Sequence, residues 1–424
     1  MTPNLKRSPL LSTTCLAILA VCAACSREAP PPAQTADTAP TAAAGKVGEP
    51  LETREPNGTD FNPAFVGQTR IGGLQSDFEL EISEVAKDIA SGWAFEFLPD
   101  QRILVTERQG TLRIVDKDGN LSDPLKNVPK VFFQGQGGLL DVALDPQFAT
   151  NRTIYWTYAE PREGGNGTAL AKGVLSADES SLEQVQVIFR QMPTYDGNLH
   201  FGSRIVFTPD GKLFLALGER SNPDARVHSQ DLNSHFGKVV RLNLDGSVPA
   251  DNPFVGRNDA KPEIWSYGHR NIQAATLDGA GKLWTIEHGP RGGDELNQPQ
   301  PGRNYGWPVI TYGIEYAGPK IGEGITQKEG MEQPVYYWDP VIAPSGMIVY
   351  DGSMFPEWQG NIFVGGMASM KLVRLQLEND KVVGEEWLLR DRGRVRDVRQ
   401  GADGAIYVLL EAADGAIVRI ARKS

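Results

Sequence analysis

The sequence predicts an all-β protein whose fold is a six-bladed β-propeller, on three observations. A unit of turn residues, an alternating apolar strand and a polar or glycine break recurs six times. The apolar runs, such as "KLFLALGE" and "AIYVLLE", are short, rich in β-branched or aromatic residues, and bounded by Asp-Gly pairs that favour hairpins. No amphipathic helical pattern of comparable strength competes with them.

The six copies are spaced far enough apart for about four strands each, which is the size of a propeller blade. In chain order they are "LPDQRILVTERQG" (98–110), "LDPQFATNRTIYWTYAE" (144–160), "TPDGKLFLALGE" (208–219), "LDGAGKLWTIEHG" (277–289), "DGSMFPEWQGNIFVGG" (351–366) and "GADGAIYVLLEAADG" (401–415). A β-sandwich or two small barrels is the alternative interpretation. In a propeller the loops of all blades converge on the central axis, so we expect the site residues to be scattered along the sequence.

Composition indicates one large folded domain, which we place at residues 61–424. The chain has 424 residues, and all-β folds of this size often form a single unit. Its 42 Lys and Arg against 53 Asp and Glu give a net charge of −11, which repels nucleic acid and anionic lipid surfaces. We therefore expect no nucleic-acid partner.

The N-terminus resembles an export signal over residues 1–25. A short basic region precedes an apolar run from Leu10 to about Ala24, which is too short to span a bilayer and has the length of a secretory signal core. The stretch "AVCAACS" resembles a bacterial lipobox with Cys25 as the acylated residue. Cys22 stands where Leu is usual, which leaves ordinary cleavage as the alternative.

The next segment, residues 26–60, is rich in Pro, Ala and Thr, and we expect it to be a semi-extended tether. The protein is thus expected in the periplasm, or anchored in the outer membrane through a lipidated Cys25. All three cysteines lie within the predicted signal segment, so the mature domain can contain no internal disulfide.

Histidine supplies the candidates for a base that works near neutral pH, and the chain has five of them. The spacing of His228, His235 and His269 matches no zinc site, and no cysteine remains in the mature domain to assist, which disfavours zinc catalysis. His200 follows a glycine-containing turn in "NLHFGSRIVFTPDG" and directly precedes a strand, from which its ring can project into a central cavity. We take His200 as the candidate base; a loop histidine bonded to the backbone is the alternative.

A second candidate site lies in "IEHGPRGGDELNQPQPGRNYGW" (286–307), which is rich in glycine and proline and has neither helical nor strand periodicity. Such a loop exposes carbonyl oxygens. Those of Gly289 and Pro290 can point together at a hard cation such as calcium. A structural turn with solvated Asp294 and Glu295 is the alternative.

Several cationic and amide side chains form a third group of candidates. Arg270 and Asn271 follow a glycine-containing loop in "SYGHRNIQ" and are rigid donors suited to carboxylate or quinone oxygens. Lys371 lies in "GMASMKLVRL", and Arg394 and Arg396 occur at strand spacing on one face. On the propeller axis these cations would hold a polyanionic ligand; on the surface they would be solvated.

Seven motifs in order carry a resemblance to a known family. They are "GQGGLLDVALDPQF", "LHFGSRIVFTPDGKLFLALGE", "SYGHRN", "EHGPRGGDELN", "NYGWP", "APSGM" and "RVRDV". Together they resemble the soluble aldose and glucose/sorbosone dehydrogenases, which use pyrroloquinoline quinone (PQQ). The similarity runs from about residue 75 to the C-terminus.

The resemblance implies oxidation of aldose sugars at the anomeric carbon to lactones. His200 would take the proton from the anomeric hydroxyl while hydride passes to the quinone. Calcium, held by the Gly289 and Pro290 carbonyls and by the cofactor, would polarise the reacting quinone carbonyl, with Arg270 near the same oxygen. The implied partners are an aldose and an electron acceptor, either a quinone or a cytochrome.

The resemblance also assigns residues to cofactor and metal. Contacts with the cofactor fall to Gln136, Arg270, Asn271, Lys371, Arg394 and Arg396, and Tyr316 is placed beside its flat ring. A second, structural calcium would use Glu295 and the Tyr305 carbonyl.

One departure bears on the substrate: Glu219 stands where the glucose-specific branch carries Asp, and the long insertions of that branch are absent. The chain therefore resembles the broad aldose dehydrogenase branch. A calcium-dependent propeller lactonase and a non-catalytic propeller that binds an envelope partner are the alternative functions.

Overall fold

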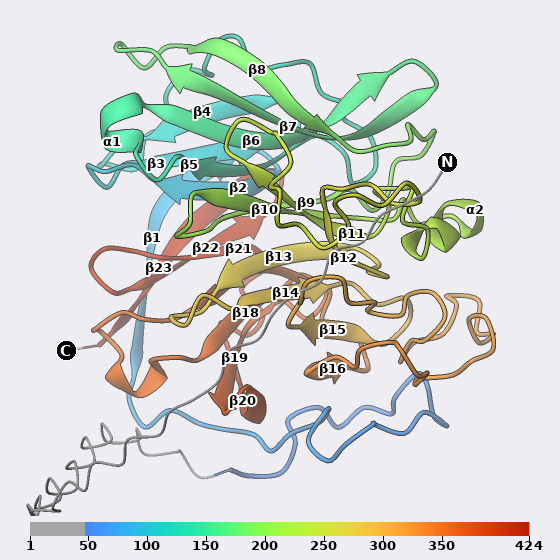
Figure 1. Ribbon diagram of the computed structural model, residues 1–424. Helices are drawn as coiled ribbons and strands as arrows, with labels where there is room; N and C mark the ends of the chain where they lie inside the picture. The colour runs from blue at the N-terminus through green and yellow to red at the C-terminus, as the bar shows by residue number, and fades with distance from the viewer. Residues whose placement is uncertain (1–46, 424) are drawn as a thin grey trace, which may run out of the picture. The chain divides into compact units, whose positions relative to one another are not determined.

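The structure is a computed structural model that describes residues 47–423. These residues form six antiparallel sheets that follow one another in chain order (Figure 1). The sheets are β2 (Gly92–Phe97), β3 (Ile103–Glu107) and β4 (Thr111–Val115); β5 (Leu139–Leu144), β6 (Thr153–Arg162), β7 (Gly165–Leu175) and β8 (Leu182–Arg190); β9 (Gly202–Phe207), β10 (Lys212–Leu217), β11 (Lys238–Asn243) and β12 (Ile264–Tyr267); β13 (Ile272–Leu277), β14 (Leu283–Glu287), β15 (Asp294–Asn297) and β16 (Tyr336–Trp338); β17 (Pro344–Val349), β18 (Ile362–Gly366), β19 (Lys371–Glu378) and β20 (Lys381–Leu388); and β21 (Arg394–Gln400), β22 (Ile406–Glu411), β23 (Gly415–Arg422) and β1 (Leu80–Ile89).

The predicted six-bladed β-propeller is confirmed. Each of the six repeated sequence units contains the second strand of a different sheet, namely β3, β6, β10, β14, β18 and β22. The first strands of neighbouring sheets pack against one another in a closed ring around the axis. The blue strand β1 pairs with the red strand β23 in Figure 1, so the N-terminal strand completes the C-terminal sheet and closes the ring.

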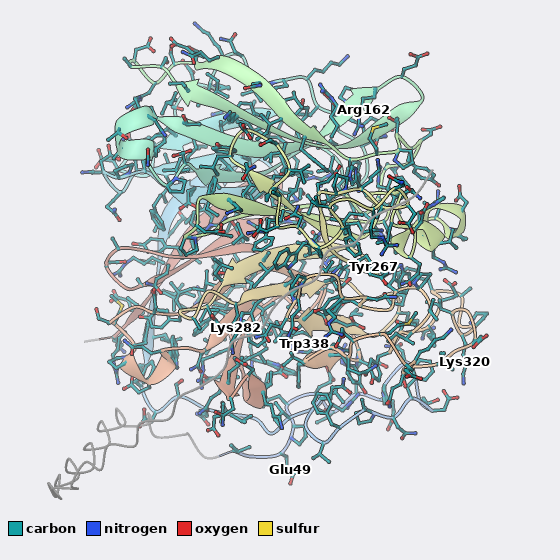
Figure 2. All side chains as sticks on the ribbon, in the orientation of Figure 1. Glu49, Arg162, Tyr267, Lys282, Lys320 and Trp338 are labelled. Carbon is teal, nitrogen blue, oxygen red and sulfur yellow. The ribbon has the colours of Figure 1, made fainter. Side chains whose placement is uncertain are left out.

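Helical structure in residues 47–423 is limited to single turns, α1 (Phe148–Asn151), α2 (Pro223–Arg226), η1 (Val227–Ser229) and η2 (Pro356–Trp358). No helix in this range is long and apolar enough to cross a membrane. Apolar side chains fill the space between adjacent sheets (Figure 2). Trp338, for example, packs between the fourth and fifth sheets together with Trp284 and Val364.

The predicted signal peptide, Cys25 and most of the predicted tether lie outside the described residues. The described part of that tether is bonded to the propeller. Gly48 donates to the Gly73 carbonyl at 2.8 Å, and the backbone N–H groups of Asn57 and Gly58 each donate to the Asp339 carboxylate at 2.9 Å. Packing against the propeller thus begins before residue 61, the start that we expected for the domain.

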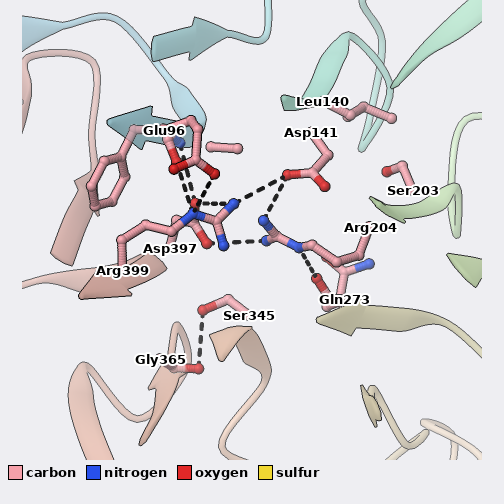
Figure 3. A network of polar contacts seen from close by, with 12 residues as sticks. Glu96, Leu140, Asp141, Ser203, Arg204, Gln273, Ser345, Gly365, Asp397 and Arg399 are labelled. Carbon is pink, nitrogen blue, oxygen red and sulfur yellow. Dashed lines mark hydrogen bonds and ion pairs between the residues drawn. The ribbon is translucent and has the colours of Figure 1, made fainter. Parts of the chain in front are cut away.

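A buried ionic network ties four of the six innermost strands together at the axis (Figure 3). Arg204 on β9 contacts Asp141 on β5 at 2.7 Å and Asp397 on β21 at 3.2 Å. Arg399 contacts Asp397 at 3.4 Å and lies 3.8 Å from Glu96 on β2. We call this network the axial ion cluster. It links the first three sheets of the chain to the last one.

Asp141→Ala is expected to destabilise the fold by about 3–5 kcal/mol, because it leaves Arg204 buried with only one of its two carboxylate partners. Denaturant unfolding measures this. The control, Asp259→Ala, breaks the exposed Arg257–Asp259 pair, whose side chains are 46% and 69% exposed, and should leave the unfolding midpoint nearly unchanged because solvent screens the pair. An equal loss of unfolding free energy in both variants would contradict a role for the axial ion cluster in stability.

Candidate active site

A cavity of about 230 Å³ lies on the axis at the end of the propeller where the first strands begin and the second strands finish. Because first and second strands are antiparallel, the start of one and the end of the other meet at this face in every sheet. The polar residues that line the cavity include Arg108, Gln136, His288, Arg394, Arg396 and Glu411.

His200 lies directly beside this cavity, between the lining residues Gln136 and Phe201. Its backbone N–H donates to Gln136 Oε1 at 2.8 Å, and its ring Nδ1 lies 2.6 Å from Glu219 Oε2. Since an ionised carboxylate only accepts hydrogen bonds, Nδ1 carries the proton and Nε2 has the free lone pair. The Ser221 N–H donates to the same Glu219 oxygen at 2.8 Å and fixes the carboxylate.

The protonation states of this pair suit a base. Burial lowers the pKa of His200, an effect that the charge of Glu219 opposes and that of Arg270 reinforces. Burial acts to raise the pKa of Glu219, but the charge and hydrogen bond of His200, together with Arg270, outweigh it and lower the pKa. At neutral pH the ring is therefore neutral and the carboxylate ionised.

The loop after β14 brings one of the two predicted metal-binding carbonyls, that of Gly289, to Arg270. Arg270 Nη1 donates to the carbonyls of His288 at 2.9 Å and Gly289 at 2.6 Å. Asp294 holds this loop, because its carboxylate accepts the Gly289 N–H at 2.7 Å. Burial raises the pKa of Asp294 to about 7. His288 Nε2 lies 2.7 Å from the Pro344 carbonyl, which fixes its ring at the cavity wall.

Three arginines converge on one carboxylate at the opposite wall. Glu411 Oε2 accepts from Arg396 at 2.8 Å and lies 3.3 Å from Arg394 Nη2, while Glu411 Oε1 lies 3.7 Å from Arg108 Nη1. Arg396 is 7% exposed, and its Nε is buried without a partner in the described residues. The cluster has more cations than anions and is therefore suited to an anionic ligand.

A buried acidic pair lies on the sheet behind the loop. Glu287 on β14 and Glu295 on β15 are cross-strand partners, and burial and the charge of Glu287 raise the pKa of Glu295 well above its usual range. Two positions along the ladder, on the same face, Thr285 pairs with Asn297. Thr285 Oγ1 and Asn297 Oδ1 are buried without hydrogen-bond partners in the described range. Two repelling carboxylates and two free oxygens suit a hard cation.

Tyr305 lies beside this acidic pair. Its ring stacks on His269 at 4.7 Å between centroids, and His269 Nδ1 lies 3.0 Å from Glu287.

Asn271 is buried near the cavity, where its Oδ1 accepts the Gly202 N–H at 3.1 Å and its Nδ2 has no partner among residues 47–423.

Three of the seven predicted cofactor contacts, Gln136, Arg394 and Arg396, line the cavity. Arg270 and Asn271 do not line it but bond to the lining residues His288 and Gly202. Tyr316 and Lys371 are not brought to the cavity wall. Tyr316 is 70% exposed, on the long segment between β15 and β16. Lys371 Nζ lies over the Trp387 ring, 3.2 Å from its centroid. Burial lowers the pKa of Lys371, and the charges of Glu52 and Glu385 oppose this effect without cancelling it. Arg108, His288 and Glu411 also line the cavity, although nothing in the sequence motifs singled them out. Glu219 stood out in the sequence only as a departure from the family pattern.

The sequence model of the family described as Glucose / Sorbosone dehydrogenase matches residues 89–419, which is more than half of the chain and covers all six sheets. The chain belongs to the glucose/sorbosone dehydrogenase family. The aldose sugar dehydrogenase of Escherichia coli (strain K12) is 45% identical over 337 residues, which cover 78% of this chain and 90% of that protein. The chain, like these relatives, is an oxidoreductase.

Solved structures agree with this assignment. A crystal structure of a glucose dehydrogenase is 47% identical, with a TM-score of 0.79, and the match covers 81% of this chain and 100% of the other. The PQQ-bound form of an aldose sugar dehydrogenase from Streptomyces coelicolor is 26% identical, with a TM-score of 0.67, and the match covers 82% and 100%. Both are similar to this dehydrogenase over the whole propeller.

Proposed function

We propose that this chain oxidises aldose sugars at the anomeric carbon to lactones, with PQQ as hydride acceptor and calcium as its partner ion. The observation that carries the proposal is the pairing of a neutral, Glu219-oriented His200 with a cavity whose charged groups are mostly cations. A base and an anion-binding wall in one cavity are what this reaction needs. Membership of a family of sugar dehydrogenases supports the same reading.

The donors around the cavity fit a ligand with three carboxylates. Arg396 Nε, Arg270 Nε and Asn271 Nδ2 are buried N–H groups without partners in residues 47–423, so each can gain a hydrogen bond from a bound ligand. We assign Arg108, Arg394 and Arg396 to the carboxylates, and Arg270 and Asn271 to the quinone edge. Bound PQQ supplies an electrophilic quinone carbon that accepts hydride.

The residues at both predicted metal sites offer oxygen donors, which calcium prefers. We assign Gly289 and Pro290 to the ion at the cofactor through their carbonyls. Arg270 now donates to the Gly289 carbonyl, and we expect it to turn toward the quinone oxygen when the ion binds. Glu287, Glu295, Asn297 and the Tyr305 carbonyl are assigned to a second, structural ion.

The chain's own part in the reaction is proton transfer. His200 Nε2 takes the proton of the anomeric hydroxyl as hydride leaves the same carbon, and Glu219 stabilises the imidazolium that forms. Arg270 is buried, with its guanidinium 5.1 Å from the Trp307 ring centroid, and would supply the positive charge that stabilises the quinone oxygen as it becomes negative.

The function is tested by adding PQQ and calcium to the purified apoprotein and following dye reduction with a panel of aldoses. We expect reduction with several aldoses, dependent on both additions. The absence of dye reduction with every sugar would refute the proposal, and hydrolysis of sugar lactones without PQQ would favour a lactonase instead.

Export and attachment through Cys25 remain predictions from the sequence.

The pH dependence of kcat/KM follows from His200. Because burial lowers its pKa below the usual value of 6.5, the base stays neutral and active as pH falls through 6.5, and kcat/KM should decline only at lower pH. Glu219→Gln removes a negative charge that raises the pKa of His200. The acid limb of the variant's kcat/KM profile should therefore lie at a still lower pH, and its kcat should fall. An acid limb of the wild type at or above pH 6.5 would contradict these protonation states.

Calcium is expected to stabilise the apoprotein through Glu295. At a free concentration of about 100 times Kd, binding to the folded state alone adds about 2.7 kcal/mol, which thermal unfolding with calcium and with EDTA detects. Glu295→Gln should lose this response. In EDTA the variant should be the more stable protein, since folding no longer has to bury or protonate a carboxylate beside Glu287. A calcium response that survives in Glu295→Gln would place the ion elsewhere.

A further inference from the structure

Arg220 directly follows Glu219 in "LGER", is 1% exposed and does not line the cavity. Its guanidinium reaches back to the segment that carries His200. Nε donates to the Leu199 carbonyl at 3.0 Å, and Nη2 donates to the Gly197 carbonyl at 2.7 Å. The cation also lies over the ring of Phe201, 4.1 Å from its centroid. One side chain thus contacts residues on both sides of His200.

Asn166 on β7 completes the arrangement. Its Oδ1 accepts from Arg220 Nη2 at 2.7 Å, its carbonyl accepts from Nη1 at 3.3 Å, and its own Nδ2 donates to Gly197 at 2.9 Å. The guanidinium makes no hydrogen bond to a carboxylate in the described part of the chain. Its hydrogen bonds go to the carbonyls of Gly197 and Leu199 and to Asn166. A buried cation held by carbonyls and one amide fixes backbone rather than balancing charge.

The held segment needs such a clamp because its backbone is unusual. His200 has φ of 50°, in the left-handed region that non-glycine residues rarely adopt. Gly218 permits the close approach, since a Cβ there would meet the His200 carbonyl oxygen at 2.3 Å. The bond from Nδ1 to Glu219 depends on this backbone geometry, because the backbone conformation sets the direction of the Cα–Cβ bond from which the ring extends.

We propose that Arg220, with Asn166, is a positioning residue that clamps residues 197–201 and so aims the His200 ring at Glu219 and the cavity. Arg220 touches neither sugar nor cofactor. The inference rests on the proposed function for its effect on turnover, whereas its effect on the His200 ring holds whatever the reaction is. Lysine keeps the charge but lacks the planar fork that reaches several carbonyls at once.

The test is Arg220→Lys in protein whose five histidines carry 13C at Cε1, with the His200 resonance assigned by its loss in His200→Ala. We expect that resonance to shift and its pKa to move toward 6.5 as the ring leaves its buried bond with Glu219. In the PQQ-reconstituted enzyme kcat should fall on the order of 10²-fold, as for a reacting group displaced by about 1 Å, with PQQ affinity unchanged.

Arg374→Lys is the matched control. Arg374 is also a buried arginine, 5% exposed, with an asparagine oxygen at 2.6 Å and a tryptophan ring at 5.6 Å, but it lies on β19 away from the cavity. Unlike Arg220 it also pairs with a carboxylate, that of Glu386, at 2.7 Å. It should lose stability without moving the His200 resonance. Asn166→Ala, which removes one side of the clamp, should shift the same resonance and serves if Arg220→Lys does not fold.

An unmoved His200 resonance in both clamp variants, or the same shift in Arg374→Lys, would overturn the clamp. If the wild type lacks dehydrogenase activity, the proposed function fails while the resonance still decides on Arg220. If activity is present and the resonance does not move, the clamp alone fails.

Discussion

His200→Ala is expected to lower kcat with aldoses by about 10²–10⁴-fold, because it removes the general base. PQQ binding should persist, since the wall that carries Arg394 and Arg396 is formed by a different sheet. The measurement is steady-state dye reduction at saturating PQQ and calcium, with PQQ affinity determined separately.

His228→Ala is the control for this substitution. The His228 side chain is 44% exposed, and its Nδ1 lies 3.4 Å from Asp231, so the loss of this ring should leave kcat unchanged. A wild-type kcat in His200→Ala would remove His200 from the mechanism. Loss of PQQ binding in the same variant would make it a structural residue.

Arg396→Ala is expected to weaken PQQ binding by roughly 10–150-fold, with kcat at saturating PQQ nearly unchanged. A charge-assisted hydrogen bond contributes about 1.5–3 kcal/mol, and each 1.4 kcal/mol is a factor of about ten in Kd. The contact serves ground state and transition state alike, so it acts on affinity. Equilibrium titration of the apoprotein with PQQ measures the change.

Arg394→Ala provides the comparison, because Arg394 lines the same wall but its side chain is 49% exposed. Solvent screens its charge, and the loss of affinity should be smaller than for Arg396. A larger loss in Arg394→Ala, or a kcat defect at saturating PQQ in Arg396→Ala, would contradict the assignment of the buried cation to a cofactor carboxylate.

The fold was predictable because each blade repeats its own local signal. Turn residues followed by an apolar run mark the second strand of every sheet, from "LPDQRILV" in the first to "GADGAIYVLL" in the last. The closure of the ring by β1 was not predictable in this way. This closure pairs residues more than 300 positions apart, such as Leu80 with Arg422. The local sequence pattern of β1 does not indicate which strand it pairs with.

The spacing of Arg394 and Arg396 predicted that the two side chains share a face of one strand. It did not decide between the axis and a solvated surface, and the structure places both residues at the cavity. Tyr316 and Lys371 were assigned to the cofactor by family resemblance, and these contacts stay predictions. In the structure Tyr316 is 70% exposed and Lys371 lies over the Trp387 ring.

The missed residues share a signal that the repeats contain. Second strands run in the same direction in every blade, so their ends collect at one face of the propeller. Four repeats place a glutamate at or just after that end, namely Glu107, Glu219, Glu287 and Glu411. Aligning the repeats by this acid would have placed Glu219, Glu411 and Arg108 at the face that contains the cavity, without naming their partners.

The most direct measurement of the central claim is a single turnover without dye or oxygen. Protein reconstituted with PQQ and calcium is mixed with an aldose that carries either hydrogen or deuterium at the anomeric carbon, and the absorption of the bound quinone is followed. We predict reduction within one turnover, slower with deuterium, and nearly abolished in His200→Ala. A quinone spectrum that aldoses leave unchanged, or reduction at equal rates with both isotopes and in both proteins, would contradict the account.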